Sequence, residues 1–253
     1  MRLIKESCVE TYDEAMNAEI RGADRIELCS RLDLDGLTPS KELVKRLVSD
    51  LTIPLKVIVR PRKGDFCYSN EEINQMHNDI LDFKSLGVFG VVFGALEDDK
   101  TVDINVVNEL VSTSNGLDVT FHKAIDQTND LLDAYKNLLL HTKINSVLTS
   151  GGAKSAVHGY KTLKKMLNIK SGKVRIIIDV RIYNSCTRRK SIEYSRPFRN
   201  FSWHTRSICL VSMICLGFTK VIYFSGSDEK DLSVKVREDL FDTRNIANST
   251  RIR

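Results

Sequence analysis

The chain has 253 residues and an ordinary globular composition, with 42% apolar residues, 28% charged residues and a formal net charge of +5. No apolar stretch approaches the roughly 20 residues that a membrane-spanning helix needs, which argues against a membrane protein. The first residues, MRLIKESCVE, have no signal-peptide core, so we expect a soluble cytoplasmic protein.

Short apolar runs rich in β-branched residues recur along the chain and predict strands. In chain order they are RLIKESCV (2–9), RIELC (25–29), LKVIV (55–59), GVVF (90–93), LDVTFH (117–122), INSVLT (144–149) and VRIII (174–178). Runs of this length and composition are typical of interior strands in a parallel sheet.

Amphipathic stretches between these runs predict helices. They cover residues 11–23, 40–51, 69–87, 129–141 and 158–169. The third has the clearest limits, because Ser69 and Glu72 can form a capping box and Gly87 can end the helix.

The alternation of strands and helices predicts a parallel sheet with helical crossovers. A doubly wound open sheet usually has a glycine-rich turn after its first strand, and residues 2–9 are not followed by one. A TIM barrel needs about 250 residues, which agrees with the length of the chain. We therefore predict an α/β fold in which residues 1–253 form one (β/α)8 TIM-barrel domain.

Polar residues follow the predicted strands at the ends where a barrel carries its functional groups. The candidates are Glu6, Cys8, Glu27, Cys29, Arg60, Arg62, His122 and Asp126. Because parallel strands end at the same edge of a barrel, we expect these side chains to gather around one opening.

The stretch RPRKGDF (60–66) contributes two arginines to this opening. Arg60 and Arg62 can bind the carboxylate or phosphate of a small anionic ligand. They can equally form ion pairs with Glu27 and Glu6, and both interpretations stay open. For an enzyme acting on a small anionic substrate, the catalytic candidates are Glu27, His122 and Asp126, since carboxyl and imidazole groups serve as acids and bases.

Six motifs in order resemble the CutC family of copper homeostasis proteins over residues 1–178. They are GADRIELCS (22–30), GLTPS (36–40), RPRKGDFCYS (60–69), GVVFGAL (90–96), VTFHKAID (119–126) and VLTSGG (147–152). The resemblance implies a cytoplasmic TIM-barrel protein that is linked by name to copper and is often oligomeric, so we expect a homodimer. It also implies a site at Glu6, Glu27, Arg60, Arg62, His122 and Asp126.

Copper as Cu(I) prefers sulfur ligands, which makes the cysteines the candidate metal ligands. The chain has six cysteines and no C-x-x-C pair, and in the cytoplasm they are expected to be reduced. Cys8 and Cys29 follow Glu6 and Glu27 by two residues on adjacent predicted strands, so we expect them to face each other. The alternative is that both are ordinary core thiols.

The resemblance ends after Ile178. Residues 179–216 form an atypical segment, with no glycine between residues 173 and 216 and without the motif expected at an eighth strand. A shifted reading frame that yields an inactive product is one account, and a real divergence is the other. FTKVIYFS (218–225) is the candidate eighth strand, and the sequence leaves open whether the barrel is complete.

The segment 181–206 is rich in arginine, which is a feature of nucleic-acid-binding proteins. It lacks the interleaved aromatic residues on which bases stack, so we do not expect a nucleic-acid partner.

Overall fold

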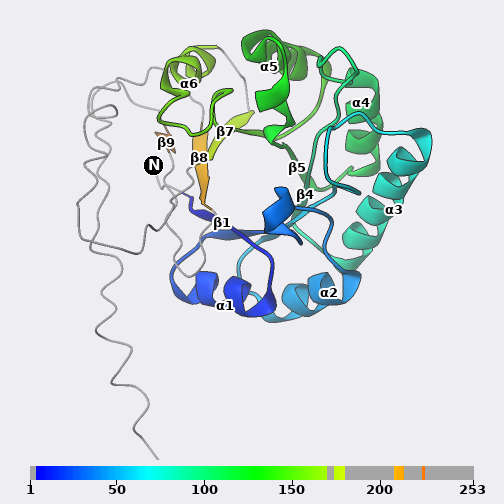
Figure 1. The fold of residues 1–253 in the computed structure, drawn as a ribbon. Coiled ribbons are helices and arrows are strands. Elements are labelled where there is room, and N and C mark those ends of the chain that lie inside the picture. Colours follow the sequence, from blue (N-terminus) through cyan, green and yellow to red (C-terminus); the bar gives the residue numbers. More distant parts are fainter. Residues whose placement is uncertain (1–3, 170–173, 180–207, 214–223, 226–253) are drawn as a thin grey trace, which may run out of the picture.

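The computed structural model describes residues 4–169, 174–179, 208–213 and 224–225. Figure 1 shows a barrel of short strands surrounded by helices. The strands that close around the barrel are β1 (Glu6–Val9), β2 (Arg25–Leu28), β3 (Leu55–Ile58), β4 (Gly90–Phe93), β5 (Asp118–Phe121), β6 (Ser146–Thr149), β7 (Arg175–Asp179) and β8 (Ile208–Met213).

Each of these strands pairs in parallel with the next one along the chain. The last, β8, pairs with β7 and also with β1, where Glu6 is opposite Ser212 and Ser7 is opposite Met213. The sheet is therefore closed, and the predicted TIM-barrel architecture is confirmed for the described residues. A short further strand, β9 (Phe224–Ser225), pairs with β8 in the antiparallel direction.

The eighth strand does not lie where the sequence analysis placed it. We predicted it at residues 218–225, and the structure has it at Ile208–Met213, inside the segment that we considered atypical. The apolar run ICLVSM supplies that strand without the family motif that we looked for. Residues 218–223 lie outside the described part of the chain.

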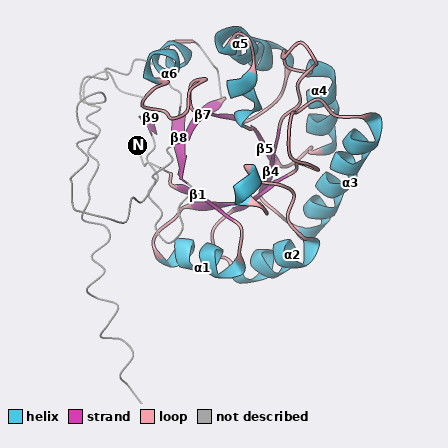
Figure 2. Cartoon of the chain, in the orientation of Figure 1, coloured by secondary structure: helices cyan, strands magenta, loops and turns pink. Residues whose placement is uncertain are grey.

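Helices cover the outside of the barrel, as Figure 2 shows. They are α1 (Tyr12–Ile20), α2 (Lys41–Asp50), α3 (Asn70–Leu86), α4 (Ile104–Thr113), α5 (Leu131–His141) and α6 (Tyr160–Leu167), with short 3-10 turns η1 (Leu32–Leu34) and η2 (Lys123–Gln127). All five predicted helices are present, and α4 was missed. None of the helices in the described residues is long and apolar enough to cross a membrane.

The ends of α3 confirm the predicted signals. The Ser69 side chain accepts a hydrogen bond from the backbone N–H of Glu72, and the Glu72 carboxylate accepts one from the N–H of Ser69. Gly87 has a φ of 88°, a left-handed conformation that favours glycine at a helix end.

Strand residues alternate between two environments, and this alternation positions the site. One set packs against the helices and includes Ile26, Val57, Val91 and Val147, all fully buried. The other set faces the inside of the barrel, and at the amino ends of the strands it is charged. Inside, Arg25 pairs with Glu6, and Asp118 pairs with both Lys56 and Arg175.

Candidate functional site

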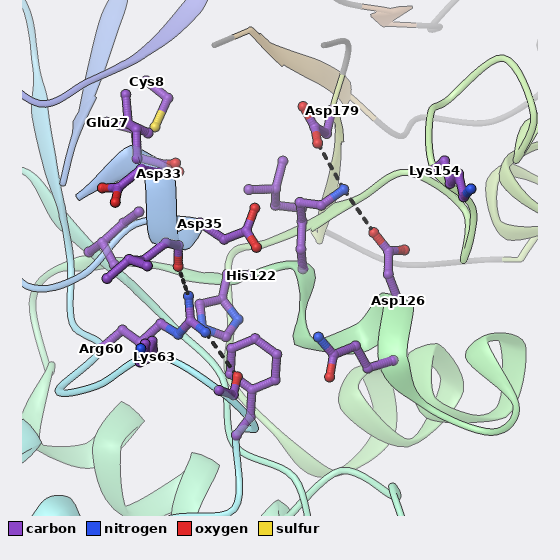
Figure 3. A pocket seen from close by; sticks show the side chains of 18 of the residues that line it. Cys8, Glu27, Asp33, Asp35, Arg60, Lys63, His122, Asp126, Lys154 and Asp179 are labelled. Carbon is purple, nitrogen blue, oxygen red and sulfur yellow. Dashed lines mark hydrogen bonds and ion pairs between the residues drawn. The ribbon is translucent and has the colours of Figure 1, made fainter. Parts of the chain in front are cut away.

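A cavity of about 830 Å³ opens at the carboxyl ends of the strands (Figure 3). Five of the predicted site residues line it, namely Cys8, Glu27, Arg60, His122 and Asp126. Glu6, Arg62 and Cys29 do not. The parallel strands therefore bring most of the predicted side chains together at one opening, as the topology of a barrel requires.

Glu6 lies deeper in the barrel than the sequence analysis placed it. It is the first residue of β1, its side chain is fully buried, and its carboxylate pairs with Arg25. Glu6 faces inward like Cys8 but lies two residues before it, which is about 6 to 7 Å at the usual rise of a strand. A ligand in the cavity therefore does not contact Glu6 directly.

Arg62 does not line the cavity, so its predicted role in binding a ligand there is not supported. Its guanidinium pairs with Glu72 at 2.6 Å and with Asp65 at 2.9 Å, and it donates to the carbonyl oxygen of Cys67 at 2.7 Å. The predicted pairing of the arginines with Glu6 and Glu27 is also not what the structure shows. Arg62 instead fixes the loop between β3 and α3.

Arg60 lies in the wall of the cavity with only 4% of its surface exposed. Its Nη1 donates to the carbonyl oxygens of Leu34 at 3.0 Å and Gly36 at 3.2 Å, and its Nη2 donates to that of Gly64 at 3.0 Å. The guanidinium also lies 4.8 Å from the ring centre of Phe66. Arg60 thus joins two loops and brings a buried positive charge to the cavity.

His122 is held as a neutral imidazole. Its Nδ1 accepts a hydrogen bond from the backbone N–H of Ala124 at 3.2 Å, which assigns the ring proton to Nε2. Burial, and then the positive charge of Arg60, lower the pKa of His122 to about 3. The interpretation of His122 as an acid or base that titrates near neutral pH is therefore not supported, and its ring serves as a hydrogen-bond donor.

Glu27 has the opposite shift. Burial, and then the negative charge of Glu6, raise the pKa of its carboxyl group to about 8. The side chain is 2% exposed, and Oε2 has no hydrogen-bond partner in the described part of the chain. Glu27 is therefore mostly protonated at neutral pH.

Lys123 and Asp126 form a second charged group in the cavity wall, and Figure 3 shows Asp126 and Asp179 on the side away from Cys8 and Glu27. The Lys123 Nζ lies 2.8 Å from an oxygen of Asp179 and 3.2 Å from one of Asp126. Asp126 also accepts from the backbone N–H groups of Ser150 at 2.9 Å and Gly152 at 2.8 Å. Asp126 therefore positions Lys123 and the loop after β6, and its catalytic role stays a prediction.

Lys123 and Asp179 line the cavity but were not selected from the sequence. Their positions in the sequence could have identified both residues. Lys123 directly follows His122 in the motif VTFHKAID, and Asp179 comes directly after the apolar run VRIII.

The two predicted thiols face each other. Cys8 and Cys29 lie on neighbouring strand ends with their Sγ atoms 3.8 Å apart, and 6% and 0% of their surfaces are exposed. The Cys29 thiol also lies 3.5 Å from the carbonyl oxygen of Val9, to which it donates. The hydrogen bond to Cys29, and then burial, raise the pKa of the Cys8 thiol well above its usual value.

The thiol pair is the nearest approach to a soft-metal site among the described residues. These residues contain no group of three or more His, Cys, Asp or Glu side chains arranged to hold a metal ion. Cys8 lines the cavity, and the fully buried Cys29 does not. A metal ion at this place would therefore take two sulfur ligands from the described part of the chain.

The sequence profile of the CutC family matches residues 3–187. The chain is 39% identical over 172 residues to a family protein CutC from Pasteurella multocida, a match that covers 68% of this chain and 70% of that protein. It is 40% identical over 174 residues to a copper homeostasis protein cutC homolog from Homo sapiens, which covers 69% and 63% of the two chains.

A solved CutC structure from Streptococcus agalactiae has the same fold. The TM-score is 0.65 at 24% sequence identity, and the match covers 70% of this chain and 88% of that one. A phosphonopyruvate hydrolase structure also matches, with a TM-score of 0.52 at 14% identity over 70% of this chain and 66% of the other. At these identities the likeness concerns the barrel and not the site.

Proposed function

The chain belongs to the CutC family, and from this premise we propose that it binds copper as Cu(I) through the sulfur atoms of Cys8 and Cys29. Relatives from human and mouse are named copper homeostasis protein cutC homologs. The observation that carries the proposal is the distance of 3.8 Å between two buried sulfur atoms at the edge of a cavity.

The distance suits a single soft ion. Zinc–sulfur bonds, a guide for other metals, are about 2.3 Å long. Two bonds of about this length span more than 3.8 Å, so one ion can reach both Sγ atoms with a bent S–metal–S angle. Cu(I) favours thiolate ligands over carboxylate oxygen, which favours the sulfurs of Cys8 and Cys29 over the oxygen of Glu27.

His122 is a poor third ligand despite lining the same cavity. A neutral imidazole binds a metal through a nitrogen without a proton, and in His122 that nitrogen, Nδ1, already accepts from the N–H of Ala124. We therefore propose a site with two sulfur ligands. Both thiols must lose their protons when the ion binds, because the thiolate is the ligand.

The site requires thiols that remain reduced, so we further propose that the protein works in the cytoplasm, where thiols are kept in that state. Two buried sulfur atoms at this separation would otherwise be exposed to oxidation through the cavity that Cys8 lines.

Copper titration against a chromogenic Cu(I) chelator under anaerobic conditions tests the proposal. We expect the full chain to bind one Cu(I) ion in competition with the chelator and the double variant Cys8→Ala, Cys29→Ala to lose this binding. The matched control is Cys67→Ala, which removes a half-buried thiol in the loop after β3 and should leave binding unchanged.

A reciprocal variant tests whether the pair is sufficient. In it Cys8 and Cys29 are retained and the four other cysteines, Cys67, Cys186, Cys209 and Cys215, are replaced by alanine. This variant should bind Cu(I) like the wild type. Copper binding by the double variant, or its loss in the reciprocal variant, would show that the ligands lie elsewhere.

A further inference from the structure

Two buried donors in the wall of the cavity have no acceptor in the described part of the chain. They are Nε2 of His122 and Nε of Arg60, on side chains that are 7% and 4% exposed. Figure 3 shows the His122 ring beside the Arg60 guanidinium. Buried donors without partners are rare in native proteins because the lost hydrogen bonds to water are not replaced. Here both belong to residues that line one cavity.

The His122 ring is held in place from several sides. Its Nδ1 accepts from the Ala124 N–H, and its ring centre lies 4.8 Å from that of Phe66. Gly94, directly after β4, leaves room for it, since a Cβ at Gly94 would lie 2.6 Å from Nδ1. These contacts fix both the orientation of the ring and the nitrogen that carries the proton, so Nε2–H is a pre-positioned donor.

Several cations lie around this donor, in a cavity wall that also carries the carboxyl group of Glu27 and the exposed carboxylate of Asp35. Arg60 is buried beside it, and two exposed lysines of the cavity wall, Lys63 and Lys154, have no ion-pair partner among the described residues. The third lysine, Lys123, is engaged by Asp126 and Asp179. The acidic Asp33 of the wall is paired with Arg31 at 2.9 Å.

We propose that this wall of the cavity binds a small organic carboxylate, one oxygen of which accepts a hydrogen bond from Nε2–H of His122 next to the charge of Arg60. The ligand supplies acceptors for the two donors that have no partner, and its negative charge offsets the positive charges of Lys63 and Lys154. The cavity, at about 830 Å³, lies within the usual range for small-molecule sites. This site is separate from the thiol pair and does not depend on copper.

A phosphate is disfavoured because the loop after β6 lacks free backbone donors. Phosphate sites in barrels and elsewhere commonly use several N–H groups of a glycine-rich turn. In the sequence Ser150-Gly151-Gly152 those groups are occupied, since Ser150 and Gly152 donate to Asp126 and Gly151 donates to the Thr149 hydroxyl. The remaining donors suit the two oxygens of a carboxylate.

Titration of the full chain with acetate, pyruvate, succinate and inorganic phosphate, at constant ionic strength, tests the proposal. Binding is measured by calorimetry, and the Nε2–H group of His122 is followed by NMR of protein with ¹⁵N-labelled histidine. We expect at least one of the three carboxylates to bind and to shift the His122 signal, with phosphate binding more weakly. The ¹⁵N shifts report the ring tautomer in the same experiment.

Two variants separate the donor from its position. His122→Phe keeps an aromatic ring without the donor, and Gly94→Ala keeps the donor but forces the ring to move. Each should weaken carboxylate binding by about tenfold or more, the usual effect of losing a hydrogen bond to a charged group. His77→Phe, on α3, is the matched control and should bind like the wild type, and thermal unfolding shows which variants are folded.

The outcomes separate this site from the copper site. Carboxylate binding should persist in the double variant Cys8→Ala, Cys29→Ala, and Cu(I) binding should persist in His122→Phe. The proposal is overturned if none of the carboxylates binds, if phosphate binds more tightly than all of them, or if His122→Phe and Gly94→Ala, both folded, bind as well as the wild type.

Discussion

Replacing Asp118 by alanine is expected to lower the free energy of unfolding by about 3 to 5 kcal/mol, the usual cost of breaking a buried ion pair. Asp118 is the first residue of β5, and its carboxylate pairs with Lys56 and Arg175 inside the barrel. Lys56 is fully buried and also donates to the Thr120 hydroxyl at 2.6 Å. Without Asp118, two cations are left in the interior without their counter-charge.

The pKa shifts of Asp118 and Lys56 agree with an ion pair inside the barrel. Burial acts to raise the pKa of Asp118, but the charges of Lys56 and Arg175 outweigh it and hold the pKa below its usual value. Burial, and then the charge of Arg25, lower the pKa of Lys56 to about 8. The carboxylate is therefore ionised and depends on its partners, as they depend on it.

Urea unfolding followed by circular dichroism measures the effect. The matched control is Asp82→Ala, which breaks an exposed pair with Lys41 and should cost less than about 1 kcal/mol. Adding Lys56→Met to Asp118→Ala should recover part of the loss, because an apolar side chain needs no counter-charge. If Asp118→Ala costs no more than Asp82→Ala, the charged interior does not stabilise the barrel.

The pH dependence of stability should contain two large and opposite contributions, from His122 and Glu27. The pKa of His122 falls from 6.5 to about 3 on folding, so the stability that it contributes is present above pH 6.5 and is lost as the pH falls towards 3. The pKa of Glu27 rises from 4.5 to about 8, so its contribution is present below pH 4.5 and is lost as the pH rises through 8.

Between pH 7 and pH 5 these two effects nearly cancel in the wild type, and single variants should separate them. At about 1.4 kcal/mol for each pH unit, acidification over this range costs about 2 kcal/mol through His122 and returns a similar amount through Glu27. Glu27→Gln should therefore lose about 2 kcal/mol more than the wild type on acidification, and His122→Phe about 2 kcal/mol less.

Urea unfolding at pH 7 and pH 5 checks both values, with replacement of the exposed His158 by phenylalanine as the matched control. The free energy of unfolding could instead change by the same amount in the wild type, Glu27→Gln and His122→Phe. That result would mean that neither group is held in the protonation state that its surroundings indicate. A smaller loss for Glu27→Gln than for the wild type, or a larger loss for His122→Phe, would contradict the direction of the pKa shift of that group.

The sequence was sufficient to predict five of the residues that line the cavity, because parallel strands bring their carboxyl ends to one edge. Alternation along each strand also placed Cys8 and Cys29 on facing positions, and their sulfur atoms lie 3.8 Å apart. The alternation does not show, however, how deep in the barrel an inward-facing side chain lies. Glu6 has the same inward direction as Cys8 but lies in the charged layer near the start of β1.

Residues beyond the strand ends were harder to place. Arg60 and Arg62 are separated by two positions, but the chain leaves the strand after Ile58, so the alternation rule no longer applies and Arg62 turns towards Asp65 and Glu72. The burial that sets the pKa of His122 depends on Phe66 and other residues distant along the chain. No local pattern in the sequence reports it.

The carboxyl-terminal part was the least predictable from the sequence. The strand at Ile208–Met213 carries no family motif, and we placed the eighth strand later. A shifted reading frame in residues 179–216 stays a hypothesis, and the nucleotide sequence of the gene tests it. Helix α4 was missed although INVVNELVST has an apolar face, with Val106, Val107 and Leu110 buried.

X-ray absorption at the copper edge, on full-length protein loaded anaerobically with one equivalent of Cu(I), tests the assignment of the two thiols most directly. The account predicts a Cu(I) spectrum with scattering from two sulfur neighbours and none from nitrogen, and no bound copper in the double variant Cys8→Ala, Cys29→Ala. Nitrogen or oxygen neighbours as the main ligands, or an unchanged spectrum in that variant, would contradict it.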